Sequence, residues 1–255
     1  MKSLKTVFGI IVLFVMFSSC SSDSGSGQNT MKIVAKATYA NTANKNANGV
    51  VMNSTVVLSS FKINIKEIEF KLAESEGNGG EDDGTDDHGN GDDNHDGMYN
   101  GDDEVGLNGP WELDLLNQTA PITTVTIANG TYEEVEFKLN KSLVTTSPMF
   151  NKTVEIRGTI DGTPFVFSHD YEQDFEIDYH DAAQNLVVSN SSFDLVLNID
   201  LNMVMSQVDL SSAVDGNGNG VIEISPNDTD GNNELAQQLN DDIEHATEMH
   251  DEHHH

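Results

Sequence analysis

The chain has 255 residues and a formal net charge of −31 at pH 7, with 12 Lys and Arg against 43 Asp and Glu. Phosphate binding needs clustered basic side chains, so this composition excludes nucleic acid as a partner and disfavours direct adsorption to an anionic membrane. Such a charge attracts cations and repels itself, so we expect salt or divalent ions to stabilise the fold.

The first 19 residues have the pattern of a cleaved export signal that ends just before the only cysteine. Two lysines precede an apolar run over 7–17, and small residues then lead to Cys20. The run is shorter than a membrane-spanning helix needs. A lone cysteine cannot form an intramolecular disulfide, so acylation explains it better than the alternative, an ordinary secretory signal with an incidental thiol. We therefore predict a lipoprotein signal peptide over 1–19, lipidation at Cys20 and a flexible tether over 20–30.

The residues behind this cysteine indicate the membrane in which the anchor sits. Ser21 follows Cys20 where an Asp would indicate inner-membrane retention. The Ser- and Gly-rich stretch, with Asp23, resembles signals found behind the lipidated cysteine of bacterial surface lipoproteins. We predict a lipid anchor in the outer membrane, facing either the periplasm or the cell surface.

The body of the chain, over 31–210, alternates apolar and polar residues in short runs. The clearest runs are 61–70, 131–139 and 193–201, and a slip near Lys66 indicates a bulge or a strand break. A period of two predicts strands with one buried and one wet face, as in antiparallel sheets. We predict about nine or ten strands without helices, in one antiparallel β-sandwich domain of immunoglobulin-like or related topology.

Turn signals separate these runs. Asp161 and Gly162 lie between the runs 154–160 and 165–167, which predicts a tight hairpin. Tyr132 follows another turn signal, and we interpret it as a core aromatic residue, with a tie between turn and sheet as the alternative.

Residues 74–104 form an acidic insertion between two predicted strands. The insertion is dense in Gly, Asn and Asp, holds His88 and His95, and has almost no apolar residues. It cannot bury a core of its own, so we predict that it is disordered. The alternative is a low-affinity cation sponge, with carboxylates for calcium and histidines for a softer metal.

The order of motifs along the body is similar to that of a known family. The strand over 63–72 is followed by the segments 109–116 and 127–135, by a strand containing Phe165, and by the strand 193–200. Over residues 31–205 this order resembles the bacterial lipoprotein family called domain of unknown function 4382. The resemblance implies an exported β-sandwich and supplies no established enzyme activity. The acidic insertion and the C-terminal extension depart from the family.

The segment 211–232 has the spacing of a calcium loop. Oxygen-bearing side chains stand at positions 1, 3 and 5, glycine at 6, a main-chain carbonyl at 7 and an acid at 9. Position 12 is Pro226 where a bidentate Glu belongs, and Asp228, Asp230 or Glu234 could supply that ligand instead. The predicted calcium ligands are Asp215, Asn217, Asn219, Val221, Glu223, Asp228 and Asp230. With few charged ligands we expect a dissociation constant on the order of 10⁻⁴–10⁻³ M and a structural role; the alternative is an Asn- and Gly-rich turn that binds no ion.

The period changes after residue 232. Apolar residues then recur every three or four positions, which predicts one amphipathic helix with Asn232 or Asn233 as its cap, the only clear helix in the chain. We assign 233–255 to this helix and the His-rich tail into which it runs. His250 and His254 would share a helical face, so His245, His250 and His254 form a possible second metal site for zinc or copper. The alternative is a frayed, solvent-exposed tail.

Catalytic patterns are weak. Ser168, His169 and Asp170 are consecutive in a predicted strand, so their side chains point to opposite faces and cannot form a hydrogen-bonded triad. We predict that the chain is not an enzyme. The function we expect is a lipid-anchored, calcium-stabilised β-sandwich that binds a surface glycan, polymer or protein or has a structural role. The alternative is a zinc- or copper-capturing lipoprotein that uses the tail and the acidic insertion.

Overall fold

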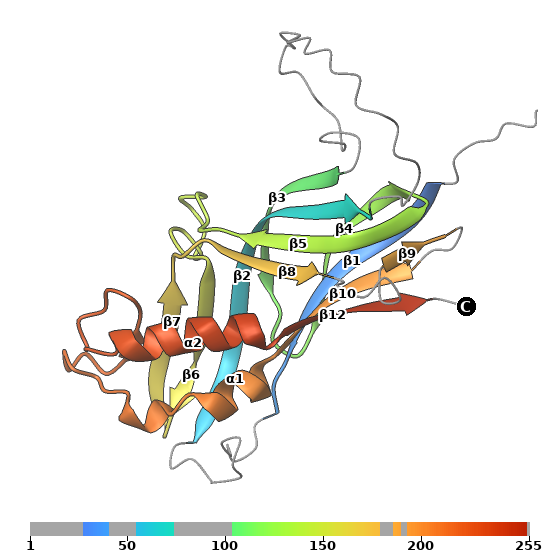
Figure 1. Cartoon of the computed structure of the whole chain (residues 1–255). Helices are drawn as coiled ribbons and strands as arrows, with labels where there is room; N and C mark the ends of the chain where they lie inside the picture. The colour runs from blue at the N-terminus through green and yellow to red at the C-terminus, as the bar shows by residue number, and fades with distance from the viewer. Residues whose placement is uncertain (1–27, 41–54, 74–103, 179–185, 190–192, 254–255) are drawn as a thin grey trace, which may run out of the picture.

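The computed structural model describes residues 28–40, 55–73, 104–178, 186–189 and 193–253. Their fold is mainly β, as predicted, and consists of two sheets and two short α-helices (Figure 1). The signal peptide, Cys20, nearly all of the acidic insertion and His254 lie outside the described residues.

The smaller sheet has four strands in the order β12-β10-β1-β4. These strands are β1 (Gln28–Thr38), β4 (Thr119–Ala128), β10 (Phe193–Asp200) and β12 (Thr247–His253). β1 and β10 run parallel, whereas β1–β4 and β10–β12 are antiparallel. The sheet is therefore mixed, and the prediction of purely antiparallel pairing is wrong. β1 and β10 are separated by most of the chain, which leaves room for the long crossover that parallel neighbours require.

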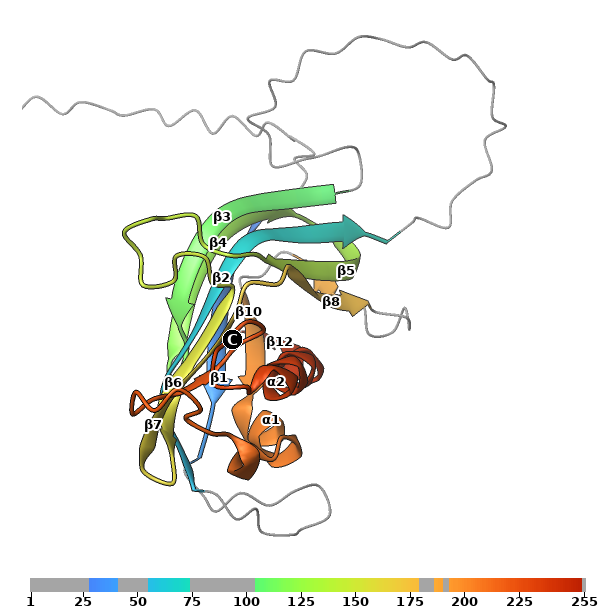
Figure 2. The ribbon, with the colours of Figure 1, turned by 90° about the vertical axis from the view of Figure 1, so that its left-hand side faces the viewer.

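The larger sheet follows the path β11-β7-β6-β2-β5-β8, with β3 paired to β2 and β9 paired to β5. Its strands are β2 (Val56–Leu72), β3 (Glu104–Asp114), β5 (Gly130–Leu139), β6 (Val154–Ile160), β7 (Thr163–His169), β8 (Gln173–Asp178), β9 (Leu186–Val188) and β11 (Ile222–Ile224). β11 pairs with β7 in parallel, so this sheet is also mixed. The six strands of the path curl into a half-barrel (Figure 2).

β2 holds the half-barrel together because it pairs with three strands. Its first half pairs with β6 and its second half with β5, while β3 runs along its other edge. The predicted irregularity near Lys66 is confirmed, because the register shifts between Ile65 and Glu67. Lys66 is exposed and Glu67 is half-buried, so the bulge places two successive polar residues away from the core.

The predicted hairpin and the predicted core tyrosine are both confirmed. β6 and β7 pair through a two-residue turn in which Asp161 has a φ of 50° and Gly162 a φ of 85°. Tyr132 is fully buried and packs edge-on against Phe70, with ring centroids 6.1 Å apart. Its hydroxyl also donates to the carbonyl of Ala128 at 3.2 Å, so the alternative tie to the turn is present as well.

A short helix that we did not predict follows β10 directly. α1 spans Leu201–Gln207, and Asp200 caps it by accepting a hydrogen bond at Oδ1 from the amide of Asn202 at 2.9 Å. Its buried face carries Leu201, Val204 and Met205, which have helical spacing but extend over little more than one turn. So short a pattern cannot be separated from the strand that precedes it.

The predicted C-terminal helix is confirmed at its start but not in its length. α2 spans Asn233–His245 and buries Leu235, Leu239 and Ile243. The chain then turns into β12 at the edge of the smaller sheet, so the segment 247–253 does not continue the helix. Figure 2 shows both helices on the same side of the half-barrel as β10 and β12.

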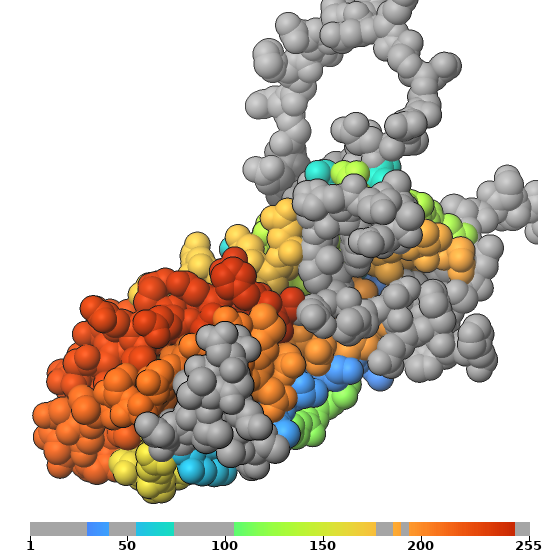
Figure 3. Space-filling model, turned by 60° about the horizontal axis from the view of Figure 1, so that its bottom comes forward, coloured from blue at the N-terminus to red at the C-terminus, as the bar shows by residue number. Residues whose placement is uncertain are grey.

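Both sheets and both helices contribute to one buried apolar cluster. The largest fully buried side chains are Tyr132, Phe61, Phe70, Phe137, Phe165, Phe167 and Met31. In the space-filling view the C-terminal segments, in orange and red, cover one end of the molecule (Figure 3). α2 and the loop before it thus belong to the same folded unit as the sheets.

Candidate cation-binding loop and an unpredicted hollow

The loop over 213–232 joins a short 3₁₀ turn at Leu210–Ser212 to α2, and it carries β11 at the edge of the half-barrel. Asn232 closes the loop. Its side-chain nitrogen donates to the carbonyls of Val214 and Glu223 at 2.8 and 2.7 Å, and its side-chain oxygen accepts from the amide of Val214 at 3.0 Å. The loop therefore has a fixed base.

Asp215 organises the first half of the loop. Its Oδ1 accepts hydrogen bonds from the amides of Gly218 and Asn219 at 2.8 and 3.1 Å, and its Oδ2 accepts one from Gly220 at 2.8 Å. Gly220 has a φ of 89°, a conformation that favours glycine. The chain at positions 1 to 6 is therefore wrapped around one carboxylate.

The two predicted asparagine ligands also turn into the loop. The Oδ1 of Asn217 accepts from the amide of Asn219 at 3.0 Å, and the Oδ1 of Asn219 accepts from the amide of Val221 at 2.8 Å. Each amide oxygen has a second lone pair. The Nδ2 of Asn217 donates to Glu223 Oε2 at 3.1 Å, which brings this acid to the same part of the loop.

Asp230 connects the two halves of the loop. Its Oδ1 accepts from the amide of Asn217 at 3.0 Å and its Oδ2 from the amide of Glu223 at 2.8 Å. Asp230 is only 5% exposed. Within the described part of the chain, no Lys, Arg or His forms a salt bridge with it. It is therefore a buried carboxylate that only backbone amides compensate.

Asp228 has a different role. Its Oδ1 accepts from the amides of Asp230, Gly231 and Asn232, and its Oδ2 from the amide of Ser225 at 2.8 Å. All of its hydrogen bonds stay within residues 225–233. Asp228 thus shapes the turn into α2, and these contacts do not join it to the Asp215 end of the loop.

The predicted ligands do not form a carboxylate-rich metal centre. Among the residues that the structure describes, no group of three or more His, Cys, Asp or Glu side chains lies close enough together to hold a metal ion. An ion in this loop would have to draw on amide and main-chain carbonyl oxygens, which the sequence also predicted. The acids that could add a charged ligand to these oxygens are Asp215, Glu223 and Asp230, because their hydrogen bonds lie in the same part of the loop.

The predicted histidine pair on a helical face is wrong. His245 is the last residue of α2, and His250 lies in β12 opposite Val196 of β10. His254 itself lies outside the described residues.

His169 is the buried member of the Ser168-His169-Asp170 sequence. It is 2% exposed and packs between the rings of Phe167 and Tyr171, with centroids 5.7 and 5.5 Å away. Neither ring nitrogen has a hydrogen-bond partner among the described residues. Burial lowers the pKa of His169 to about 4, although the charge of Asp170 opposes this shift.

Sequence reasoning missed a hollow of about 450 Å³ on the outer face of the half-barrel. It lies where the bulge at Lys66 in β2 meets Gly109 and Pro110 in β3, beneath the segment 140–144. The slip near Lys66 is visible in the sequence, where it indicates a bulge or a strand break but no hollow. The segment 140–144, which covers the place where β2 changes its pairing partner from β6 to β5, could not be placed from the sequence.

Comparison of the chain with protein-family models finds no match, and no curated protein or solved structure matches it. The resemblance over residues 31–205 therefore stays a proposal. No helix in the described ranges is both long enough and apolar enough to cross a membrane.

Proposed function

We propose that the protein is a lipid-anchored, calcium-stabilised β module that binds a partner or has a structural role at the outer membrane or the cell surface. The observation that carries the calcium part is Asp230, a buried carboxylate that forms no salt bridge with any described Lys, Arg or His. An isolated buried charge is costly, and a bound cation would remove that cost.

The same loop offers a set of oxygen ligands for a hard cation. The side chains of Asp215, Asn217 and Asn219 and the carbonyl of Val221 occupy the spacing of a calcium loop, with Glu223 held nearby through Asn217. Two neutral ligands reduce affinity, so the dissociation constant should be on the order of 10⁻⁴–10⁻³ M. Such a site suits an exterior where calcium is abundant.

The anchor and the location are proposed from the sequence around Cys20, which lies outside the described residues.

The finer fold assignment, an immunoglobulin-like or related sandwich, is supported by two sheets that share one core. Membership of the family called domain of unknown function 4382 is proposed on motif order. The absence of an enzymatic role is proposed because no catalytic pattern was found in the sequence.

Thermal unfolding of the full chain tests the calcium proposal. At about 10 mM calcium the expected affinity stabilises the fold by about 1–3 kcal/mol, or about 3–10 °C in Tm, relative to chelator. Asp215→Ala should abolish this gain, whereas Asp241→Ala, which removes a charge from the exposed face of α2, should retain it. Sodium chloride at equal ionic strength separates site binding from charge screening. Equal gains in both variants would contradict the site.

A further inference from the structure

The hollow lies at a fork in the larger sheet. The main-chain N–H of Asn64 in β2 donates to the main-chain carbonyl of Thr153 on the β6 side at 2.9 Å. The main-chain carbonyl of Asn64 accepts from the main-chain N–H of Asn140 on the β5 side at 3.3 Å. Here β2 changes partner from β6 to β5, and the loop 140–153 crosses the gap. The hollow of about 450 Å³ is within the range of ligand sites.

One wall of the hollow is fixed by a close approach between β2 and β3. A Cβ at Gly109 would lie 2.6 Å from the carbonyl oxygen of Ile65 and 2.8 Å from that of Lys66, so only glycine fits. Pro110 continues this wall, and Lys66 is the residue that the bulge leaves unpaired.

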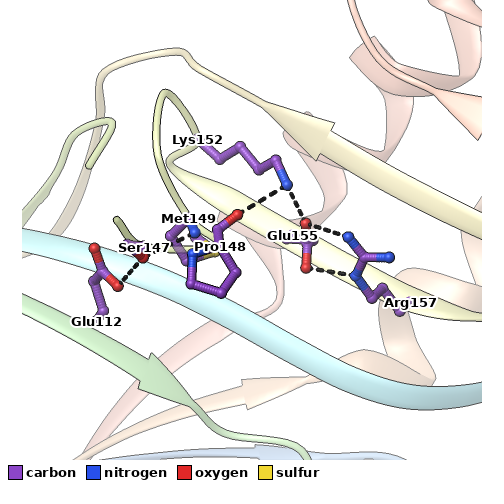
Figure 4. A network of polar contacts seen from close by, with 7 residues as sticks. All are labelled: Glu112, Ser147, Pro148, Met149, Lys152, Glu155 and Arg157. Atoms are coloured by element: carbon purple, nitrogen blue, oxygen red, sulfur yellow. Dashed lines mark hydrogen bonds and ion pairs between the residues drawn. The ribbon is translucent and has the colours of Figure 1, made fainter. Parts of the chain in front are cut away.

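The opposite wall is the loop 140–153, which polar contacts hold at both ends (Figure 4). Glu112 of β3 accepts hydrogen bonds from the hydroxyls of Ser142 and Ser147. At the far end Lys152 donates to the carbonyl of Pro148 at 3.1 Å and pairs with the buried Glu155. The hollow is therefore preformed.

A buried acceptor without a partner lies at this site. Asn64 is 2% exposed, and its Nδ2 donates to the carbonyl of Asn140 at 2.7 Å. Only the nitrogen can donate to a carbonyl, which identifies Oδ1 as the other atom of the amide. Among the described residues this Oδ1 has no hydrogen-bond partner, and a buried carbonyl left in that state favours a donor from a ligand.

Two free cations stand at the rim. Lys66 and Lys141 are exposed and line the hollow, and within the described chain neither forms a salt bridge. Glu172 is also at the rim, where its Oε1 accepts from the side chain of Asn140 at 2.8 Å, and its negative charge offsets one of the two lysines and leaves the other. Unpaired lysines in a chain of net charge −31 make this rim complementary to an anionic group.

The loop adds apolar surface next to these cations. Leu143 is 75% exposed and Val144 is 44% exposed, and both line the hollow together with Pro110. Exposed neighbouring apolar side chains at the mouth of a hollow indicate a binding surface. The site thus combines an apolar wall, two cations and one buried acceptor.

We propose that this hollow binds the carboxyl-terminal end of a peptide whose last residue is apolar. Its free carboxylate lies between the ammonium groups of Lys66 and Lys141, its side chain packs on Leu143 and Val144, and its amide N–H donates to Asn64 Oδ1. The proposal goes beyond the calcium site and is independent of it, because no residue is shared between the two.

The test is a titration of the isotope-labelled full chain, followed by NMR, with acetyl-Ala-Leu carrying a free carboxylate. We expect saturable shifts of the Asn64 side-chain amide and of the Leu143 backbone, with a dissociation constant on the order of 10⁻⁴–10⁻³ M for so small a ligand. The same dipeptide with a carboxyl-terminal amide should bind at least about tenfold more weakly, because it has no charge for the lysines.

Matched variants locate the site. The double variant Lys66→Gln/Lys141→Gln should weaken binding about tenfold or more, whereas Lys36→Gln on β1, a lysine with no salt bridge to a described residue, should leave it unchanged. Leu143→Ser should also weaken binding, and Val214→Ser, another exposed apolar residue, should not. All five positions are at least partly exposed, so melting temperatures should match the wild type. Equal affinity for acid and amide, full affinity in the double variant, or no saturation at millimolar peptide would overturn the proposal.

Discussion

Two long loops of this fold handle charge in opposite ways. The loop 140–153 leads into β6, where Glu155, a fully buried carboxylate, pairs with Lys152 of the loop and with Arg157 of the same strand. The loop 213–232 buries Asp230 with backbone amides alone. Glu155 therefore has two cationic partners, whereas Asp230 forms no salt bridge with any cationic side chain of the described chain. The comparison indicates that an external cation would neutralise a buried carboxylate in the loop 213–232, whereas Glu155 is already neutralised by Lys152 and Arg157.

The two loops meet near His169. A small hollow of about 160 Å³ is lined by His169, by Asn151 and Lys152 of the first loop, and by Ser225 and Pro226 at the exit of the second. A change of charge at His169 therefore acts next to both loops. This gives one titratable group through which acid can affect the packing between them.

The largest expected effect comes from breaking the internal ion pair. Glu155→Gln should lower the free energy of unfolding by about 3 kcal/mol, because it leaves two cations around a buried neutral amide. Urea denaturation measures the loss, and Glu176→Gln on the exposed side of β8 is the control. If Glu155→Gln lowers the free energy of unfolding no more than Glu176→Gln does, the ion pair of Glu155 does not stabilise the fold, which contradicts the contrast drawn between Glu155 and Asp230.

The pH dependence of this pair has a definite sign. Burial alone raises the pKa of Glu155, but hydrogen bonds from Arg157 and Lys152 outweigh it and hold the pKa below the ordinary value of 4.5. The stabilisation is therefore complete above that value and is lost as the pH falls through the lower, folded-state pKa.

His169 supplies the next effect. Its pKa falls from 6.5 to about 4 on burial, so the unfolded chain binds a proton more readily and stability declines as the pH drops from 6.5 to 4. The loss should reach about 3 kcal/mol. His169→Phe, which keeps a ring between Phe167 and Tyr171, should remove this component. The informative quantity is the stability difference between variant and wild type across that interval, and a constant difference would contradict the assignment.

Added charge in the second loop should raise its affinity for calcium. Asn219→Asp changes a neutral predicted ligand into a charged one, and ligand charge tunes the affinity of such loops. We expect binding about tenfold tighter, or about 1.4 kcal/mol. Asn227→Asp adds the same charge at an exposed position of this loop outside the predicted ligand set. Calorimetric titration compares the two, and equal gains would point to general charge attraction.

The smallest effect separates structural acids from predicted ligands within the loop. Asp228→Ala removes an acceptor for four backbone amides and should cost about 1 kcal/mol. Because this carboxylate shapes the turn into α2, the loss should be the same in calcium and in chelator. A loss that appears only with calcium would instead place Asp228 among the ligands, as the sequence first suggested.

The parts of the fold that the sequence predicted are those with local rules. Period-two alternation located most strands, the Asp161-Gly162 pair located a hairpin, and helical spacing located the start of α2. Parallel pairing of β1 with β10 depends on contacts between distant segments, which no local pattern encodes. The strand β12 was missed because its residues are polar and carry no alternating apolar signal.

The candidate sites divide in the same way. The loop around Asp215 was visible because its hydrogen bonds join residues two to five positions apart. The hollow depends on Asn64, Gly109 and Leu143, which belong to three segments far apart in the chain. Its exposed leucine and unpaired lysines become informative only once the fork in the sheet brings them together.

The most direct test of the cation-binding account follows the backbone amides of Gly218 and Gly220 in the full chain during a calcium titration. The account predicts shifts at these two amides that saturate with one ion per chain, at a dissociation constant on the order of 10⁻⁴–10⁻³ M, and that disappear in Asp215→Ala. Shifts that rise without saturation, or that spread evenly over exposed acidic residues while these two amides stay fixed, would contradict it.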